Sequence, residues 1–390
     1  MSDTTHDAVR LRWPAVSARR LERSALAAPA PDLDPAGIVG ALCGAHAQVL
    51  SAAELSIGMR GEGITRSVVR KTLWDEAGLI KMYGPRGTVH LLPAADLPMW
   101  VGALTALPPS PSPFPKDVRM TDEQTEEVVA AIGAALRDAE LTLDELSEAV
   151  IAATGPWAGD LVMPAFQGMW PRWRQAITLA SHRGQLCFGP NRGRKVTYTH
   201  PQHLTGDRAT DGTAALAGLV QRYLHAYGPA TPQHFARWLN VSPRWAGELF
   251  DSLGGALQRV DLEGTAAWVN AGDTGTPGEP PRGVRLLPYF DAYVVACQPR
   301  ERLYPGAMAQ RALTPSGQAG NYPVLLIDGV VSGVWHQRRS GRRLTVTVEP
   351  GTPLTSAQRA ELDAQVERLE CVLEGTAELT IGTVGVGPHA

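Results

Sequence analysis

The chain is short of cysteine and of long apolar runs, and each shortage excludes a class of protein. Its cysteines, Cys43, Cys187, Cys297 and Cys371, are too scattered for a zinc cage or a disulfide framework, and this pattern indicates a reducing cytoplasm. No apolar run approaches the roughly 20 residues that span a bilayer. The polar, acidic N-terminus has no signal-peptide core, so neither a membrane role nor secretion is expected.

Motifs that bind cofactors are missing as well. The sequence has no glycine-rich phosphate loop between a strand and a helix, no Cys/His spacing typical of zinc, and no G-x-S-x-G turn. We therefore expect neither a metal nor another cofactor. With 390 residues, 44% hydrophobic and 19% charged, the chain is predicted to be soluble and globular. Its length suits about two to four units.

Charge is unevenly distributed along the chain. The net charge is −3, which does not by itself indicate a nucleic-acid partner. Residues 121–148 are acidic, whereas basic residues gather in 170–195 and 338–343. Local potential governs contact with phosphates more than the total charge does, so both basic stretches are candidates for contact with DNA.

Three stretches share one pattern, in which helices precede a short two-stranded ribbon. This is the pattern of a winged helix, and it predicts units at 8–106, 121–206 and 211–272. A proline-rich linker, 107–120, separates the first two units. Residues 284–390 are rich in β-branched residues and glycine turns, which predicts a small antiparallel β-barrel with a C-terminal helix. The predicted fold class is therefore α+β.

The first unit contains a break between two helices. Asp34 and Pro35 are an N-cap and a first-turn proline, and Gly44 can end the helix that they open. Ser51 and Glu54 have the spacing of a capping box that opens the next helix. The residues between Gly44 and Ser51 are therefore expected in a loop.

His46 and Gln48 fall in this break. Two side chains two residues apart share a face in an extended segment, whereas on a helix they point nearly opposite ways. His46 and Gln48 can therefore point together into a cleft. The tripeptide His46-Ala47-Gln48 either forms a polar turn between helices or supplies a catalytic pair, and its spacing leaves both interpretations open.

The other elements follow from the same signals of capping, periodicity and turn residues. Helices are predicted at 16–27, 65–78, 122–138, 143–155, 166–181, 213–227 and 356–374, with two more opened by Thr231–Pro232 and Ser242–Pro243. Ribbons are predicted at 79–93, 185–200 and 257–270.

Basic side chains on these elements are candidate DNA contacts. Residues 335–343 form the densest cationic run, which is expected at the tip of a β-hairpin. One aromatic with four arginines can contact phosphates and an unstacked base, and a solvated hairpin tip is the alternative. The candidates are Arg66, Arg70, Lys71, Arg86, Arg172, Arg174, Arg192, Arg194, Lys195, Trp335, His336, Gln337, Arg338, Arg339 and Arg342.

Asp291 lies among aromatic residues, in Pro288-Tyr289-Phe290-Asp291-Ala292-Tyr293. A carboxylate in such surroundings is either buried and hydrogen-bonded or lines a pocket. We favour the structural role for Asp291.

Four strings, in order, resemble one family. GALCGAHAQ (40–48), PRGTVHLLPAADL (85–97), LLPYFDAY (286–293) and VLLIDGVVSGVW (324–335) are together similar to the winged-helix DNA glycosylases of the AlkZ and YcaQ type. The resemblance runs from about Leu11 to Glu349 and extends into the helical tail. It implies three tandem winged-helix units and a β-barrel arranged around a DNA channel.

The resemblance also implies a place for catalysis. The family carries Gln-x-Gln in its AlkZ-like members and Gln-x-Asp in its YcaQ-like ones, and this motif matches His46-Ala47-Gln48. Gln48 keeps the second glutamine, and His46 replaces the first. Because position 48 is not a carboxylate, the motif is closer to the AlkZ-like self-resistance branch. With the resemblance, the catalytic pair is favoured over the polar turn.

The activity that the resemblance implies is that of a monofunctional DNA glycosylase acting as a monomer on double-stranded DNA. Its substrate would be a cationic N7-alkylguanine carrying a bulky natural-product adduct, in DNA repair or self-resistance. The rival interpretation is a non-enzymatic transcriptional regulator, because tandem winged helices are common in regulators. A His46-Gln48 segment that faces the same channel as the basic ribbons would favour the enzyme.

Overall fold

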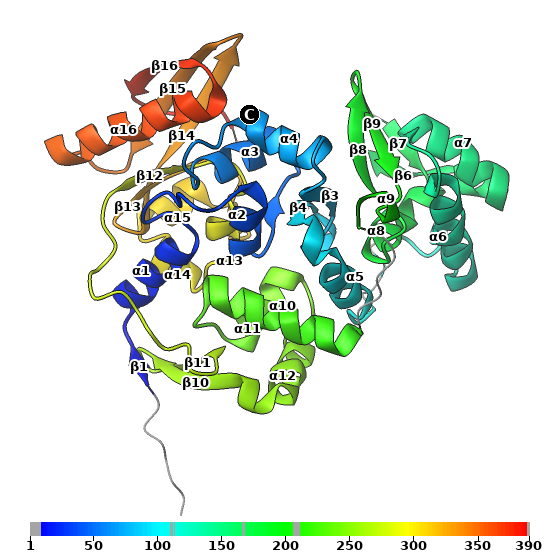
Figure 1. The fold of residues 1–390 in the computed structure, drawn as a ribbon, viewed down its shortest axis with the longest axis horizontal. Helices are drawn as coiled ribbons and strands as arrows, with labels where there is room; N and C mark the ends of the chain where they lie inside the picture. Colours follow the sequence, from blue (N-terminus) through cyan, green and yellow to red (C-terminus); the bar gives the residue numbers. More distant parts are fainter. Residues whose placement is uncertain (1–8, 110–111, 113, 166–167, 206–210, 388–390) are drawn as a thin grey trace, which may run out of the picture. The chain divides into compact units, whose positions relative to one another are not determined.

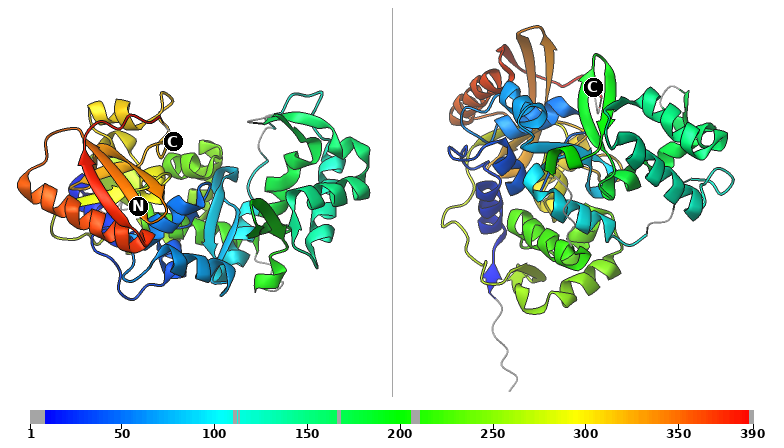
Figure 2. Two further views of the ribbon diagram at one scale, coloured as in Figure 1. Left: turned by 90° about the horizontal axis from the view of Figure 1, so that it is seen from above. Right: turned by 45° about the vertical axis from the view of Figure 1, so that its right-hand side comes forward.

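The computed structural model describes residues 9–109, 112, 114–165, 168–205 and 211–387. The chain divides into two compact units, drawn in Figures 1 and 2. Unit 1 comprises residues 1–72 and 220–390, and unit 2 comprises residues 73–219. Helices and antiparallel ribbons alternate along both units, so the predicted α+β class is confirmed.

Among the first helices, α2 begins at its predicted signals, whereas α1 spans Trp13–Arg23 and not the predicted 16–27. Asp34 accepts a hydrogen bond from the Gly37 amide at 2.7 Å, and Pro35 occupies the first turn, as a capped helix requires. The elements up to Trp74 are β1 (Arg10–Leu11), α1 (Trp13–Arg23), α2 (Pro35–Ala41), β2 (Ala45–His46), α3 (Leu50–Gly58) and α4 (Arg66–Trp74).

Unit 2 contains two antiparallel ribbons at the predicted places, β3 with β4 and β8 with β9. Capping boxes at Thr121 and Thr142 open α6 and α7. Its elements are β3 (Leu79–Tyr83), η1 (Pro85–Gly87), β4 (Val89–Pro93), η2 (Ala94–Asp96), α5 (Leu97–Thr105), α6 (Asp122–Leu136), β5 (Leu141–Thr142), α7 (Leu143–Thr154), η3 (Pro156–Gly159), β6 (Leu161–Ala165), β7 (Gly168–Pro171), η4 (Arg172–Ala176), α8 (Ile177–His182), β8 (Cys187–Arg192), β9 (Lys195–Thr199) and α9 (Gln202–Thr205).

The helix predicted at 166–181 is wrong over its first half. β7 pairs with β6 as an antiparallel ribbon, and regular helix begins only at Ile177, after the short turn η4. Gly168 (φ 150°) and Pro171 explain the difference, because neither residue favours a helix interior. Phe166, where the prediction began, lies outside the described residues.

The third helical stretch has its three long helices and its ribbon at the predicted places. α10 (Gly212–Tyr227) begins in unit 2 and ends in unit 1, followed by α11 (Pro232–Leu239), α12 (Pro243–Ser252), η5 (Gly254–Ala256), β10 (Leu257–Leu262) and β11 (Thr265–Asn270). β1 adds a parallel strand to this ribbon, at the edge of β10. α11 begins after Thr231 as predicted, and a capping box at Thr231 opens it.

The C-terminal part of unit 1 is an open sheet with the strand order β12-β13-β14-β15-β16. All neighbours are antiparallel except β15 and β16, which α16 connects in parallel. The elements are β12 (Val284–Leu287), α13 (Ala292–Ala296), α14 (Arg300–Leu303), α15 (Ala307–Ala312), β13 (Val324–Ile327), β14 (Val330–Ser340), β15 (Arg343–Pro350), α16 (Ser356–Leu373) and β16 (Thr376–Ile381).

The predicted β-barrel is therefore wrong. Among the described strands, β12 and β16 stand at opposite ends of the strand order and do not close the sheet. The reason is α16, which lies along the sheet in Figures 1 and 2. Leu362, Val366 and Leu369 of α16 pack with Val346 and Val348 of β15 in one buried cluster. A helix covers the apolar face that a barrel would cover by curling upon itself.

Candidate active site

The break that holds His46 is built by a helix end. α2 ends at Ala41, and the next turn passes through Cys43 (φ 52°) and Gly44 (φ 96°). The Gly44 amide donates to the Val39 carbonyl at 3.0 Å, which closes the turn. The chain then becomes extended in β2, so the predicted break between helices is confirmed.

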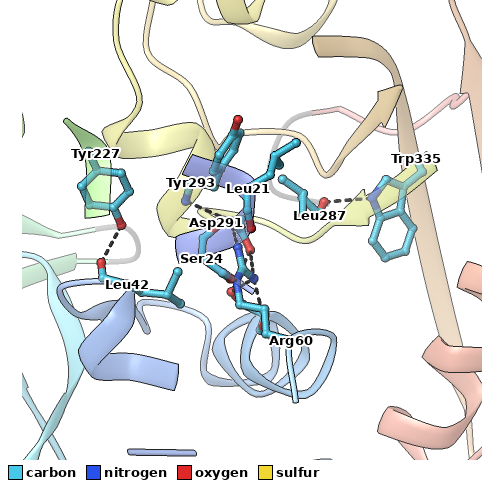
Figure 3. Close-up of polar contacts among 10 residues, drawn as sticks. Leu21, Ser24, Leu42, Arg60, Tyr227, Leu287, Asp291, Tyr293 and Trp335 are labelled. Carbon is cyan, nitrogen blue, oxygen red and sulfur yellow. Dashed lines mark hydrogen bonds and ion pairs between the residues drawn. The ribbon is translucent and has the colours of Figure 1, made fainter. Parts of the chain in front are cut away.

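A buried tyrosine fixes this turn from a distant helix. The Tyr227 hydroxyl of α10 donates to the Leu42 carbonyl at 2.5 Å, as Figure 3 shows. Burial raises the pKa of Tyr227 well above its ordinary value, so the phenol keeps the proton that it donates. The turn before His46 is therefore held by the bond from Gly44 to Val39 within its own segment and by Tyr227 of α10.

The start of α3 differs from the prediction. α3 begins at Leu50 with Val49 as its N-cap, and no side chain caps it, so the capping box of Ser51 and Glu54 is wrong. Glu54 is fully buried and instead accepts hydrogen bonds from Arg70, from Nε at 2.6 Å and from Nη2 at 3.1 Å. A charged partner holds the carboxylate more strongly than a backbone amide would.

The two candidate side chains have different surroundings. His46 is 9% exposed and its ring packs against Phe290, with the ring centroids 4.6 Å apart and the planes tilted by 34°. Ala47 is buried, and Gln48 is exposed. Extended backbone therefore carries one packed polar ring and one accessible amide, two residues apart.

The segment that carries Phe290 is locked by a buried ion pair. Arg60, just after α3, binds Asp291 through two nitrogens, each 2.8 Å from one carboxylate oxygen. The Ser56 hydroxyl and the Tyr293 amide also donate to Asp291, and Figure 3 shows Arg60 and Asp291 together with Tyr293. Asp291 is 1% exposed and fully hydrogen-bonded, so the structural role favoured from the sequence is confirmed.

The cationic run 335–343 lies on a hairpin, as predicted. β14 and β15 pair up to Ser340 and Arg343, with Gly341 (φ 61°) and Arg342 in the turn. Arg338 and Arg342 are exposed near the turn. Arg339 donates to the Leu373 carbonyl at 2.8 Å, at the end of α16.

Trp335 was predicted to contact DNA with these arginines, and this is wrong. It is 1% exposed, and its indole N–H donates to the Leu287 carbonyl at 2.9 Å, as Figure 3 shows. The side chain belongs to the sheet core, because alternate residues of a strand point to opposite faces. His336 and Gln337 are half-buried, and burial lowers the pKa of His336.

Several other candidate cations are paired with carboxylates. Within unit 1, Arg66 pairs with Glu374 at 3.0 Å, and Arg70 pairs with Glu54. Within unit 2, the carboxylate partners lie 2.8 to 3.1 Å away and are Asp160 for Arg172, Glu145 for Arg192 and Asp144 for Lys195. The hydrogen bond that Lys195 donates to Asp144 raises the pKa of Lys195. The carboxylate beside each of these cations lowers the local positive potential that would attract a phosphate.

The remaining candidate cations differ in their surroundings. Arg174 stacks over the Trp170 ring, 3.8 Å from its centroid, and Arg194 is exposed in the β8–β9 turn. Arg86 has a left-handed backbone (φ 61°) in the β3–β4 turn. Lys71, at the end of α4, is exposed.

Two general features bear on the chemistry. In the described part of the chain, no three His, Cys, Asp or Glu side chains gather as metal ligands would. Among the same residues, no helix combines the length and apolar composition that a membrane crossing requires.

The model of the AlkZ-like DNA glycosylase family matches residues 39–371. The chain belongs to this family. It is 30% identical over 375 residues to a Streptomyces sahachiroi protein named interstrand DNA cross-link repair glycosylase, covering 90% of this chain and 94% of that one. The solved structure of the Streptomyces sahachiroi DNA glycosylase AlkZ is similar at a TM-score of 0.79 and 27% identity, covering 96% of this chain and all of that one.

As a member of the AlkZ-like family, this chain is an enzyme that hydrolyses N-glycosidic bonds of DNA. The family assignment favours the enzyme over the transcriptional regulator. The sequence did not identify Phe290 as a partner of His46, because nothing local joins residues 244 positions apart. The adjacent aromatic and acidic residues of 288–293 were the available signal.

Proposed function

We propose that this enzyme excises cationic N7-alkylguanine from double-stranded DNA and leaves an abasic site. The preferred lesions are bulky natural-product adducts, and the biological role is self-resistance or DNA repair. The name of the Streptomyces sahachiroi relative, which refers to interstrand cross-links, supports lesions of this size. The enzyme acts as a monomer and binds DNA through winged-helix units at 8–106, 121–206 and 211–272.

The observation that carries the proposal is the His46-Ala47-Gln48 segment, extended after a helix end and packed against Phe290. An N7-alkylated guanine is already cationic, so it leaves without being protonated by the enzyme. The enzyme must place a water near C1′ of the sugar and stabilise an oxocarbenium-like transition state. Polar side chains held in fixed positions can orient the water and stabilise this transition state.

The two side chains have different roles in the proposal. Gln48 cannot take a proton at neutral pH, so it orients the water and the sugar by hydrogen bonds. Neutral His46 accepts a proton from the attacking water, since an imidazole with a reference pKa of about 6.5 is suited to act as a base. No carboxylate is required, because the positive charge of the lesion supplies the driving force.

Purified protein incubated with duplex DNA tests the proposal. One duplex carries N7-methylguanine and the other a bulky N7 adduct, and mass spectrometry detects the released base. We expect release from at least the bulky adduct, and loss of most release with Gln48→Ala while the dissociation constant for DNA is kept. Gln221→Ala, which also removes an exposed glutamine from unit 1, is the matched control.

Each outcome has a definite meaning. Full turnover by Gln48→Ala contradicts the role given to Gln48. No release from either duplex, with tight binding to one particular DNA sequence, contradicts the proposed substrate and restores the regulator. A glycosylase prefers a lesion over an intact site and shows a strong dependence of affinity on salt.

A further inference from the structure

Phe290 is the aromatic neighbour of the candidate base. Its ring centroid lies 4.6 Å from that of the His46 ring, within the range of aromatic contacts, and the two planes are tilted by 34°. His46 precedes β12 in the sequence, and Phe290 follows it. We infer that Phe290 is a positioning residue, whose ring sets the orientation of the His46 imidazole for the reaction. This inference rests on the proposed function of His46.

The backbone holds Phe290 in a conformation that the chain would otherwise avoid. Its φ of 51° lies in the left-handed region, which is rare for a bulky residue. Its amide donates to the Gly320 carbonyl at 3.0 Å. A side chain at Gly320 would place its Cβ 3.0 Å from Phe290 Cδ1 and 3.1 Å from Phe290 Cα, so glycine is needed for this approach.

Asp291, the next residue, also fixes the segment that carries Phe290. Asp291 is anchored by Ser56 of α3 and by Arg60, which lies just after the end of α3. The ion pair therefore ties the Phe290 backbone to the element that follows the catalytic segment. Strained backbone held by surrounding contacts is a feature of sites where geometry matters.

A flat neighbour matters for an imidazole in particular. The torsion that turns a histidine ring has a broad energy profile, so the ring is poorly oriented by its own side chain. The close contact with the Phe290 ring restricts this torsion and so places the ring nitrogens. An amide at position 46 would present no ring face to Phe290, so it would lose little when Phe290 is removed.

A double-mutant cycle tests the inference. The turnover rate on the lesion that the wild type releases is measured for wild type, Phe290→Leu, His46→Gln and the double variant. We expect Phe290→Leu to lower the rate about tenfold with His46 present, which corresponds to about 1.4 kcal/mol, and less than about threefold with Gln at 46.

Further variants separate positioning from general structural damage. Phe290→Tyr keeps the ring and is expected to keep the rate, whereas Gly320→Ala displaces Phe290 and is expected to lower the rate without adding to Phe290→Leu. Tyr322→Leu is the control, because it replaces a half-buried ring of unit 1 that packs on Arg311. Thermal unfolding of each variant establishes that the protein is folded.

The outcomes distinguish this inference from the proposed function. Equal losses from Phe290→Leu in both backgrounds, or a low rate for folded Phe290→Tyr, overturn the positioning role and leave the glycosylase standing. Absence of base release by the wild type on every N7-alkylguanine lesion overturns the proposed function, and the inference with it. A loss confined to the His46 background, with the rate kept by Phe290→Tyr, establishes the positioning role.

Discussion

At the scale of single residues, the site depends on a buried charge that takes no part in the proposed chemistry. Arg60 and Asp291 are both fully buried, with two hydrogen bonds between them. Each charge is costly to remove from water, and only the partner compensates for the loss. The net contribution of the pair to the free energy of unfolding is therefore small, whereas removal of one partner alone is costly.

Removal of one partner of this pair should destabilise the protein strongly. We expect Asp291→Asn to lower the free energy of unfolding by about 3–5 kcal/mol, because Arg60 is left buried without its counter-charge. Ser56→Ala, which removes one neutral donor to the same carboxylate, should cost only about 1–2 kcal/mol. Denaturant unfolding at pH 7 measures both. A loss below about 1 kcal/mol for Asp291→Asn would show that water reaches Arg60.

At the scale of elements, the β14–β15 hairpin has two ends of different character. Its inner end belongs to the sheet core, with Val334, Trp335, Val346 and Val348 all buried. Its outer end is exposed from Arg338 through Arg343. The change in character occurs within a few residues, so the run 335–343 combines a core anchor with a cationic tip.

The exposed arginines of this tip should contribute to DNA affinity, and the core anchor should not. We expect Arg338→Ala and Arg342→Ala to weaken DNA binding and each to reduce the slope of log affinity against log salt by about 0.9, if each arginine contacts one phosphate. Fluorescence anisotropy at several salt concentrations measures the slope. Arg359→Ala is the control, since Arg359 is on α16 and pairs with Asp363. Unchanged slopes for both tip variants would contradict the contact.

Trp335→Phe completes the comparison at this scale. It removes the indole donor to the Leu287 carbonyl, so it should lower stability while the salt slope stays at the wild-type value. Residues 335–343 thus contain a tryptophan that affects stability and arginines that affect DNA affinity.

At the scale of the whole molecule, the sequence predicted what local signals determine. N-caps and first-turn prolines gave α2, α6 and α11 their starts, and glycine turns gave the ribbons. The open sheet was not predictable, because closure depends on whether α16 covers the apolar face, which is a long-range packing choice. The His46–Phe290 contact was not predictable for the same reason, although residues 40–48 and 286–293 both belong to the strings that resemble the family.

Long-range ion pairs are a further property of the whole chain that its local patterns do not reveal. Asp273 accepts hydrogen bonds from Arg23 at 2.5 and 2.8 Å and from Arg19 at 2.8 Å, so it ties α1 to a residue about 250 positions away. The bonds from Arg23 hold the pKa of Asp273 below its ordinary value. The ionised carboxylate thus stabilises the folded state.

The pH dependence of stability should report this tie. Because the folded pKa is lowered, the stabilisation is present above the unfolded pKa of about 3.9 and is lost as pH falls through the folded value. We expect Asp273→Asn to lower the free energy of unfolding by about 2 kcal/mol at pH 7, because charge-assisted hydrogen bonds contribute roughly 1.5–3 kcal/mol. Between pH 5 and pH 2, the free energy of unfolding of the variant should fall less than that of the wild type. Urea unfolding across this range measures it, with the exposed Asp32→Asn as control. Parallel acid profiles for wild type and Asp273→Asn would mean that Arg19 and Arg23 find other partners when the carboxylate is lost.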